Sequence, residues 1–396
     1  MQPLASHWTL DPDVLFLNHG AFGACPKPVL DAQAEVRARL EREPVDFMAR
    51  QWEPRMDEAR AELGRFVGAL PDALALVSNA TTGVNTVLRS LSFSPGDEIL
   101  LADQEYNASQ NAARFVAERS GASVVVAHVP FPLSDPNEVT RALLERVTDR
   151  TRLALVDHVV STTGLVFPIQ DVVRGLDARG VDTLVDGAHA PGQVPLALEA
   201  LGAAYYTGNC HKWMCTPKGS AFLYVRPDRQ ERIHPLVISH GRNAPRRDRS
   251  RFRLEFDFTG TQDPSPWLVI PDAIRFMGGL LPGGWDELRA RNHALAVRAR
   301  GLLCESLGVG APAPESMLGS LATVPLPDAR TSTDAQPLST DPIMATLWER
   351  YRIEVLASVW PAPPQRVLRV SAQAYNEESQ YVRLASALKE ALAAGA

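Results

Sequence analysis

Lys212, near the middle of the chain, has neighbours that suit covalent chemistry at its amine. It follows the strand-like run 203–206 and a turn of small residues, and it lies between His211 and Trp213. A partly apolar pocket of this kind lowers the pKa of a lysine, and a neutral amine forms Schiff bases with carbonyl groups. The ordinary alternative is a solvated lysine in a loop.

An acid, Asp186, ends an earlier predicted strand, 183–185, and Gly187 follows it at once. Ligands of open α/β sheets bind beyond the carboxyl ends of the strands, so Asp186 is placed to meet one, although capping a turn is the structural alternative. A lysine and an acid at neighbouring strand ends are what pyridoxal 5′-phosphate (PLP) needs. The lysine binds the coenzyme, and the acid keeps its pyridine nitrogen protonated, so that the ring stabilises a carbanion at the substrate Cα. The pair predicts PLP as the cofactor.

Two further motifs fit the phosphate and the ring of this cofactor. The strand-like run 74–77 leads into the start of an amphipathic helix, where Thr81 and Thr82 add hydroxyl donors to the free N–H groups of the helix terminus. A simple Ser/Thr/Asn cap is the alternative. Tyr106 follows the predicted strand 98–102 and is placed to stack on a flat pyridine ring, with core packing as the alternative.

The elements that would position these residues alternate between strand and helix. We expect further strands at 123–129, 153–156 and 221–225, and helices at 107–119, 136–147 and 169–179. Such alternation is typical of an α/β domain whose mainly parallel sheet is covered on both faces.

The breaker cluster at 278–284 separates this region from a smaller C-terminal α+β region. There we expect helices at 285–307, 344–351 and 377–392, a strand at 367–371 and a loop at 325–342. The predicted division is an N-terminal active-site segment, 1–30, a large PLP-binding domain, 31–283, and a small C-terminal domain, 284–396.

Composition limits the partners and the compartment. The formal net charge is −6 and the pI is near 5.9, which gives no general attraction to nucleic acid or to an anionic membrane. No run approaches the ~20 apolar residues of a membrane span, and the N-terminus lacks the pattern of a signal peptide, so we expect a cytoplasmic protein. The four cysteines have the spacing of neither a disulfide framework nor a zinc site, and no metal is predicted.

These motifs resemble the class V aminotransferase family of fold-type I PLP enzymes, and within it the isopenicillin N epimerase-like group. The order matches across nearly the whole chain. The resemblance rests on Leu-Asn-His-Gly-Ala-Phe-Gly at 17–23, Asp-Gly-Ala-His-Ala-Pro-Gly at 186–192, Asn-Cys-His-Lys-Trp at 209–213 and Phe-Thr-Gly-Thr-Gln-Asp at 258–263. The lysine and aspartate motifs are specific as a pair, and the N-terminal motif indicates the group.

The resemblance implies a role for each residue around the cofactor. Lys212 holds PLP and moves the Cα proton, and Asp186 pairs with the pyridine nitrogen. His189 lies near the phenolic oxygen, where many relatives have glutamine, and Tyr106 stacks on the ring, where related cysteine desulfurases use histidine. The phosphate contacts come from Thr81, Thr82, His211 and, across a subunit boundary, Thr261. A homodimer with shared active sites is therefore the expected working unit.

Recognition of the substrate falls to the small region and the N-terminal loop. Arg369 matches the family's arginine–x–serine strand, and its guanidinium suits bidentate binding of a carboxylate. An exposed strand arginine is the alternative. Asn18 and His19 are expected to cover the substrate. The arginine-rich run 242–253 has two open interpretations, a solvated face or a rim that attracts substrates with extra carboxylates.

The chain is interpreted as an enzyme that labilises the Cα–H bond of an amino acid, with an epimerase or racemase as the leading hypothesis. Protonation of Cα from the other face gives epimerisation, protonation on the cofactor gives transamination, and loss of a β or γ substituent gives a lyase, such as a C–S lyase. The sequence leaves these open.

Three other functions are weaker hypotheses. A PLP-fold regulator conflicts with the complete lysine, acid and phosphate set, and a nucleotide-binding protein conflicts with the missing glycine-rich fingerprint. A desulfurase that carries sulfur on its own cysteine is disfavoured, because the loops at 310–318 and 325–342 contain no cysteine. Cys304 falls inside a predicted helix, where we expect it to be buried.

Overall fold

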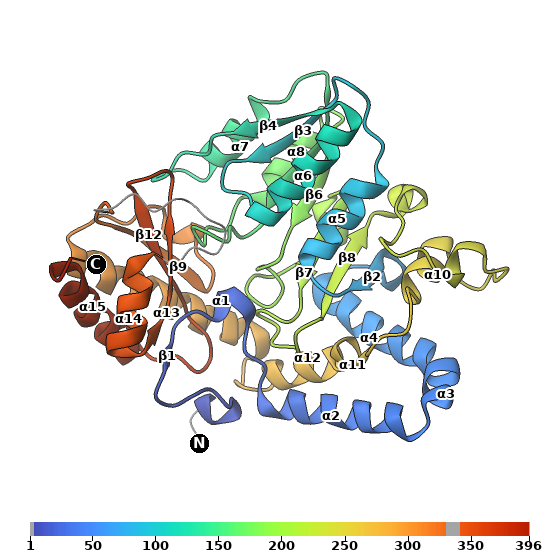
Figure 1. The fold of residues 1–396 in the computed structure, drawn as a ribbon, viewed down its shortest axis with the longest axis horizontal. Coiled ribbons are helices and arrows are strands. Elements are labelled where there is room, and N and C mark those ends of the chain that lie inside the picture. The colour runs from blue at the N-terminus through green and yellow to red at the C-terminus, as the bar shows by residue number, and fades with distance from the viewer. Residues whose placement is uncertain (1–3, 330–340, 396) are drawn as a thin grey trace.

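The computed structural model describes residues 4–329 and 341–395, and its centre is a seven-stranded sheet in the order β2-β8-β7-β6-β5-β3-β4 (Figure 1). The five strands from β7 to β4 run parallel, while β8 is antiparallel to β7 and to β2. The bounds are β2 Leu74–Val77, β3 Glu98–Ala102, β4 Ser123–Ala127, β5 Thr151–Asp157, β6 Asp182–Asp186, β7 Tyr205–Asn209 and β8 Ala221–Val225. The predicted fold-type I architecture, with its mainly parallel sheet, is confirmed.

Helices cover both faces of this sheet because its strands are apolar on both sides. One hydrophobic cluster joins the sheet to α4, α7 and α8, and another joins it to α5, α6 and α10. The helices of this region are α2 Lys27–Arg42, α3 Pro44–Asp46, α4 Trp52–Val67, α5 Ala80–Ser90, α6 Asn107–Ser120, α7 Asn137–Leu144, α8 Ile169–Asp177, α9 Leu198–Leu201, α10 Arg251–Asp257, α11 Ser265–Leu268 and α12 Ile270–Gly278. Each predicted helix of the large region is present, within a few residues of its expected ends.

A second, three-stranded antiparallel sheet lies in the C-terminal region and has a hydrophobic core of its own. Its strands are β9 Leu321–Leu326, β11 Leu356–Val359 and β12 Arg366–Ser371, and its helices are α13 Gly284–Leu307, α14 Pro342–Tyr351 and α15 Glu378–Ala393. The strands β9 and β11 were not expected from the sequence. Part of the predicted loop 325–342, residues 330–340, lies outside the described residues, and the proposed domain limits stay a prediction.

The N-terminal segment joins the two regions. Its short strand β1, Leu15–Phe16, pairs in parallel with β10, Ile353–Glu354, of the C-terminal region. The helix α1, His19–Phe22, then runs between the two sheets (Figure 1). A Cβ on Gly20 of this helix would lie 2.9 Å from the end of the Leu321 side chain of β9, so a larger residue there would have to displace that side chain.

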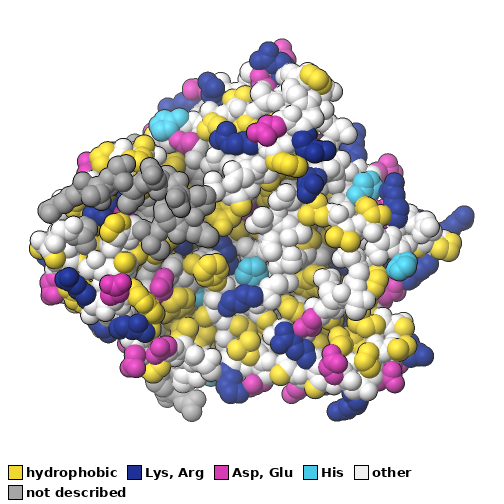
Figure 2. Space-filling model, in the orientation of Figure 1, with side chains coloured by type: hydrophobic (Ala, Val, Ile, Leu, Met, Phe, Trp, Pro, Cys, Tyr) yellow, Lys and Arg dark blue, Asp and Glu magenta, His cyan; other side chains and the backbone are white. Residues whose placement is uncertain are grey.

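The surface carries charges of both signs. Acidic and basic side chains are interspersed on the face that Figure 2 shows. No helix among residues 4–329 and 341–395 is long and apolar enough to cross a bilayer.

Candidate active site

Asp186 is the last residue of β6, at the carboxyl edge of the parallel strands, where the sequence places it. Its side chain is 2% exposed. Ser109 Oγ donates a hydrogen bond of 2.9 Å to Asp186 Oδ2, and the backbone N–H of Ala188 donates one of 3.0 Å to Oδ1. Burial raises the pKa of Asp186, while both donors and the nearby Lys212 act against that rise. The carboxylate therefore keeps support for its charged form.

Lys212 lies in the loop after β7. Its amine points to His189, which belongs to the same predicted motif as Asp186. The distance from Lys212 Nζ to His189 Nε2 is 3.0 Å. Burial lowers the pKa of Lys212 to about 7, with a further contribution from the positive charge of Arg369. A substantial share of this amine is thus neutral near neutral pH.

The contact with Trp213 indicates which tautomer His189 adopts. The indole N–H of Trp213 points to His189 Nδ1 over 3.4 Å, and an indole nitrogen only donates. The proton of the neutral imidazole then resides on Nε2 and faces the amine of Lys212. Burial, together with the charge of Lys212, holds the pKa of His189 well below its usual value, so the ring stays neutral.

The N-terminus of α5, the predicted phosphate site, begins with a side-chain cap. Asn79 Oδ1 accepts a hydrogen bond of 2.8 Å from the backbone N–H of Thr82 and one of 3.0 Å from its hydroxyl. Asn209, from the end of β7, accepts the N–H of Ala80 at 2.8 Å. The start of α5 is therefore capped by Asn79, as in the alternative interpretation. The bond from Ala80 to Asn209 connects this helix start to β7, the strand that leads to Lys212.

The phosphate roles of Thr81, Thr82 and His211 stay predictions. His211 Nδ1 lies 2.8 Å from the carbonyl oxygen of Ser220, so it carries the proton of this ring and Nε2 is left unprotonated while the ring is neutral. Burial lowers the pKa of His211 to about 4.

Tyr106 precedes α6 at the same edge of the sheet. Its side chain is 45% exposed, which rules out the core-packing alternative. An exposed ring at this edge, close enough to Arg369 to act on its charge, suits stacking on a planar ligand.

Arg369, on β12 of the small sheet, is 2% exposed, so the exposed-arginine alternative is wrong. Its Nη1 donates to the carbonyl oxygen of Ser161, and Nη2 lies 3.4 Å from Asn18 Oδ1. Its Nε has no partner, and within the described part of the chain no carboxylate lies at ion-pair distance from this guanidinium. Burial lowers the pKa of Arg369 to about 10. A buried cation without an anion indicates that a ligand supplies the negative charge.

Asn18 and His19 both contact residues of the site, and their predicted contact with substrate stays a prediction. Asn18 is hydrogen-bonded to Glu354 at 3.0 Å and so orients Arg369 from the other side. His19 is fully buried, with Nε2 3.0 Å from the carbonyl oxygen of Lys212 and Nδ1 2.8 Å from the hydroxyl of Tyr375. It holds the main chain that carries the lysine, and its predicted contact with substrate is not among these bonds.

Thr261 lies on the exposed loop between α10 and α11. Its predicted contact with the phosphate crosses a subunit boundary, so a single chain leaves both this contact and the homodimer as predictions.

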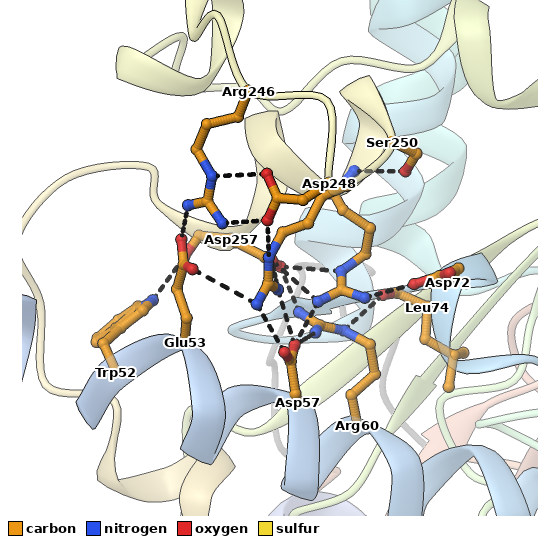
Figure 3. A network of polar contacts seen from close by, with 12 residues as sticks. Trp52, Glu53, Asp57, Arg60, Asp72, Leu74, Arg246, Asp248, Ser250 and Asp257 are labelled. Carbon is orange, nitrogen blue, oxygen red and sulfur yellow. Dashed lines mark hydrogen bonds and ion pairs between the residues drawn. The ribbon is translucent and has the colours of Figure 1, made fainter. Parts of the chain in front are cut away.

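The arginine-rich run 242–253 forms a network of ion pairs with acids of α4 and α10 (Figure 3). Arg249 contacts Asp57 at 2.7 Å and Asp257 at 3.2 Å, and Arg246 binds Asp248 at 2.6 Å. Arg253 binds Asp57, Asp72 and Asp257. Arg60 of α4, 1% exposed, joins the network through Asp57 and Asp257. The arginines of this network are paired within the chain, which favours a structural role over substrate attraction.

Sequence reasoning missed two acids beside Asp186. Asp157 ends β5 and lies opposite Asp186 in the sheet register, and Glu105 immediately precedes Tyr106. One oxygen of each of the three carboxylates lies within 4.8 Å of the other two. The strand-end rule that singled out Asp186 also applies to Asp157, so the signal was present in the sequence.

All four cysteines are buried, which confirms the expectation for Cys304. Cys304 is 8% exposed within α13, and its Sγ lies 3.8 Å from the carbonyl oxygen of Gly310. A thiol in that position is not available to carry sulfur to a partner.

Comparison with known proteins identifies the family. A family model described as aminotransferase class-V matches residues 16–384. The isopenicillin N epimerase of Streptomyces clavuligerus is 39% identical over 96% of this chain and 95% of that protein. A probable chloroplastic L-cysteine desulfhydrase of Arabidopsis thaliana is 31% identical over 96% of this chain and 83% of that protein.

Solved structures show the same fold. A variant of C-DES with glycine covalently linked to its PLP cofactor superimposes with a TM-score of 0.78 at 23% identity, over 95% of this chain and 96% of that one. The cysteine desulfurase CsdA of Escherichia coli gives a TM-score of 0.79 at 20% identity, over 99% and 98% of the two chains. The resemblance drawn from the motifs is confirmed, and the chain belongs to the class-V aminotransferase family.

Proposed function

We propose that this chain binds PLP at the carboxyl edge of the seven-stranded sheet and epimerises or racemises an amino acid at Cα. One observation carries the proposal. A lysine amine whose pKa is lowered to about 7 lies 3.0 Å from a neutral histidine, and the charge that most affects it comes from Arg369, a buried guanidinium for which the described residues offer no carboxylate partner. A base and an anion site are thus placed together.

The residues present fit the cofactor. Asp186 offers a buried carboxylate with two hydrogen-bond donors to support its charge, which suits a protonated ring nitrogen. Tyr106 offers an exposed aromatic ring. The helix α5, which is 11 residues long, offers the free N–H groups of its N-terminus to the phosphate. When bound, PLP supplies an electron-withdrawing ring that makes the Cα–H bond of an attached amino acid acidic.

The remaining steps belong to the chain's own groups. Lys212, neutral at its Nζ, accepts the Cα proton on its lone pair, and His189, whose Nε2 lies 3.0 Å away, positions the amine. Arg369 binds the substrate carboxylate, and Asn18 and the carbonyl oxygen of Ser161 hold its guanidinium in place. Together these contacts fix the substrate so that its Cα–H bond faces the amine.

The epimerase assignment is supported by the relatives. The isopenicillin N epimerases of Streptomyces clavuligerus and Amycolatopsis lactamdurans are each 39% identical and match over nearly the full length of both chains. The second candidate is a C–S lyase on cysteine or a cysteine conjugate, favoured by the desulfhydrase relatives at 31% identity. Both reactions begin with removal of the same proton, so the base and the carboxylate site serve either.

The deciding experiment incubates the purified chain and PLP with a panel of amino acids in deuterated water. Deuterium at Cα with inversion, followed by NMR and chiral chromatography, is the expected outcome. Release of pyruvate, ammonia or sulfide would replace the epimerase by the lyase, and formation of an oxo acid with aminated cofactor would replace it by an aminotransferase.

Borohydride reduction tests the cofactor and its lysine. We expect the wild type to retain PLP covalently after reduction, and Lys212→Ala to lose this labelling. Lys27→Ala is the matched control, because Lys27 is an exposed lysine of α2 that pairs with Asp31 on the same helix. A wild type that stays colourless with added PLP would overturn the proposal.

We also propose a homodimer, because Thr261 lies in an exposed loop from which it could reach the phosphate site of a second subunit. We expect sedimentation to show a dimer. Thr261→Ala should weaken PLP binding without dissociating that dimer, and a fully active monomer would contradict the shared site.

A further inference from the structure

Three buried carboxylates meet at the edge of the sheet, and only Asp186 has a place in the proposed function. Glu105 and Asp157 are each 3% exposed. The backbone N–H of Asp157 donates a hydrogen bond of 3.0 Å to Glu105 Oε2, and Asp157 lies beside Asp186 in the sheet register. One oxygen from each of the three groups lies within 4.8 Å of the others.

Three carboxylates at this spacing, out of contact with water, do not all ionise, because like charges repel strongly in a medium of low dielectric constant. The cation that acts on Asp157 and Asp186 is Lys212, whose own pKa is lowered. The nearby pair His158 and Tyr206 adds no charge. The two are hydrogen-bonded at 2.8 Å, and burial keeps both neutral by lowering the pKa of the histidine to about 4 and raising that of the tyrosine.

The hydrogen-bond donors decide which group gives up its charge. Asp186 accepts hydrogen bonds from Ser109 and Ala188, and Glu105 accepts them from the backbone N–H groups of Asp157 and Tyr106. The carboxyl of Asp157 receives no hydrogen bond from any residue in the described ranges, and its Oδ2 is buried without a partner. Glu105 Oε1 is also buried without a partner. A proton between the two acids gives both groups a partner.

We propose that Asp157 and Glu105 share one proton, with Asp157 as the donor, and that this pair is a positioning element that keeps Asp186 as the charged carboxylate toward the cofactor's ring nitrogen. The role of Asp186 rests on the proposed function, whereas the shared proton does not. Burial and mutual repulsion act in the same direction, raising the pKa of Glu105 to about 8 and that of Asp157 well above its ordinary value.

The pair makes a specific forecast for amide substitutions. Asp157→Asn keeps a donor toward Glu105 and leaves one negative charge on the pair, so it imitates the shared-proton state. The double variant Glu105→Gln with Asp157→Asn has the same shape and no charge. A purely structural role predicts that the double variant behaves as the single one, whereas a role in charge predicts a difference between them.

The first test needs no cofactor chemistry. Infrared difference spectra of the full chain, followed from about pH 6 to about pH 10, should show the C=O band of a protonated carboxylic acid that persists at pH 7. That band should disappear at higher pH and be absent in Asp157→Asn. A wild type without such a band at pH 7 overturns the proposal, as does Asp157→Asn with the band unchanged. The wild-type titration alone decides the point if the variant does not fold.

The second test measures PLP binding at equilibrium by absorbance. Asp157→Asn should bind PLP within about threefold of wild type, and the double variant should bind it about tenfold or more weakly, because it lacks the negative charge by which the pair adds to the attraction of Asp186 for the protonated ring nitrogen. Equal binding by both variants overturns the positioning role. If the wild type binds no PLP, the proposed function fails while the infrared result still decides the shared proton.

Discussion

Two groups of buried charges in this chain are built in opposite ways. In the network around α4 and α10, arginines and acids are matched, so that Arg60 meets Asp57, Asp257 and the carbonyl oxygen of Leu74. At the sheet edge, three carboxylates lie together, and Arg369 has no carboxylate partner in the described ranges. Arg60 and Arg369 are buried to nearly the same extent, at 1% and 2% exposed.

The difference separates charges that hold the fold from charges kept for a ligand. A matched buried pair recovers by attraction part of what its charges lose by leaving water, whereas an unmatched one recovers little until a ligand arrives. Substitutions at the two places should therefore have opposite consequences for stability and for activity.

The largest effect is expected for Lys212→Ala. Loss of the base should lower the rate of Cα–deuterium exchange by at least about 10³-fold. Thermal stability should be unchanged or slightly higher, because the variant removes a buried amine from an unmatched site. Exchange followed by NMR and unfolding followed by circular dichroism measure the two effects. Exchange at more than a tenth of the wild-type rate would remove Lys212 from the mechanism.

Arg60→Leu should have the largest effect on stability. It leaves Asp257, 7% exposed, without one of its buried partners, so the free energy of unfolding should fall by about 3–5 kcal/mol. Urea unfolding measures the change, and kcat per folded molecule should be unaltered. Arg65→Leu, an exposed arginine of the same helix paired with Glu62, is the control and should lose little. A small loss for Arg60→Leu would mean that pairing does not distinguish the two groups.

Arg369→Leu is the matched substitution at the unpaired site. The free energy of unfolding should change by no more than about 1 kcal/mol, since no carboxylate loses a partner. KM for the amino acid should rise about tenfold to a hundredfold with loss of the charged hydrogen bonds to its carboxylate. Arg369→Lys keeps the positive charge but loses the planar guanidinium that binds a carboxylate through two hydrogen bonds. Its KM should lie between those of wild type and Arg369→Leu. Wild-type KM in Arg369→Leu would contradict a carboxylate site.

The charge on Lys212 gives a pH effect. With a pKa of about 7 in the folded chain, the neutral fraction of the amine increases as pH rises through about 7, so capture of PLP by the cofactor-free chain should accelerate through that pH and level off above it. Because this pKa lies below the unfolded value of 10.5, the unfolded chain binds more protons between the two, and the contribution of Lys212 to stability rises with pH across that window.

Arg369→Leu should move the midpoint of this profile to higher pH, because the positive charge of Arg369 helps to lower the pKa of Lys212. Stopped-flow absorbance measures the midpoint. A midpoint that stays in place would mean that burial alone sets the pKa.

The fold was predictable where local pattern decides it. Parallel strands that are buried on both faces appear as short apolar runs between amphipathic helices, as in 98–102 and 153–156. The strand β9 was missed because it carries Pro325 and pairs only with β12, which is distant in sequence. Such a pairing has no local signature.

The site was predictable in part for the same reason. Asp186 and Lys212 follow recognisable strands, so their position needed only the rule on strand ends. The meeting of Glu105 with Asp157 depends on the order β6-β5-β3 in the sheet, which the local pattern does not contain. The partners of the arginine run were hidden likewise, since Arg249 meets Asp57, 192 positions earlier.

The smallest effect is expected at the rim of the matched network. Arg246 binds Glu53 and Asp248, but its side chain is 40% exposed, and theirs are 37% and 58% exposed. Water already screens charges at such positions, and holding long side chains together costs entropy that offsets their attraction. Arg246→Ala should therefore leave the urea midpoint of unfolding within the scatter of repeated wild-type measurements. A midpoint shift as large as that of Arg60→Leu would show that this network acts as one cooperative unit regardless of burial. The number of connected ion pairs, rather than the matching of buried charges, would then distinguish the network from the sheet edge.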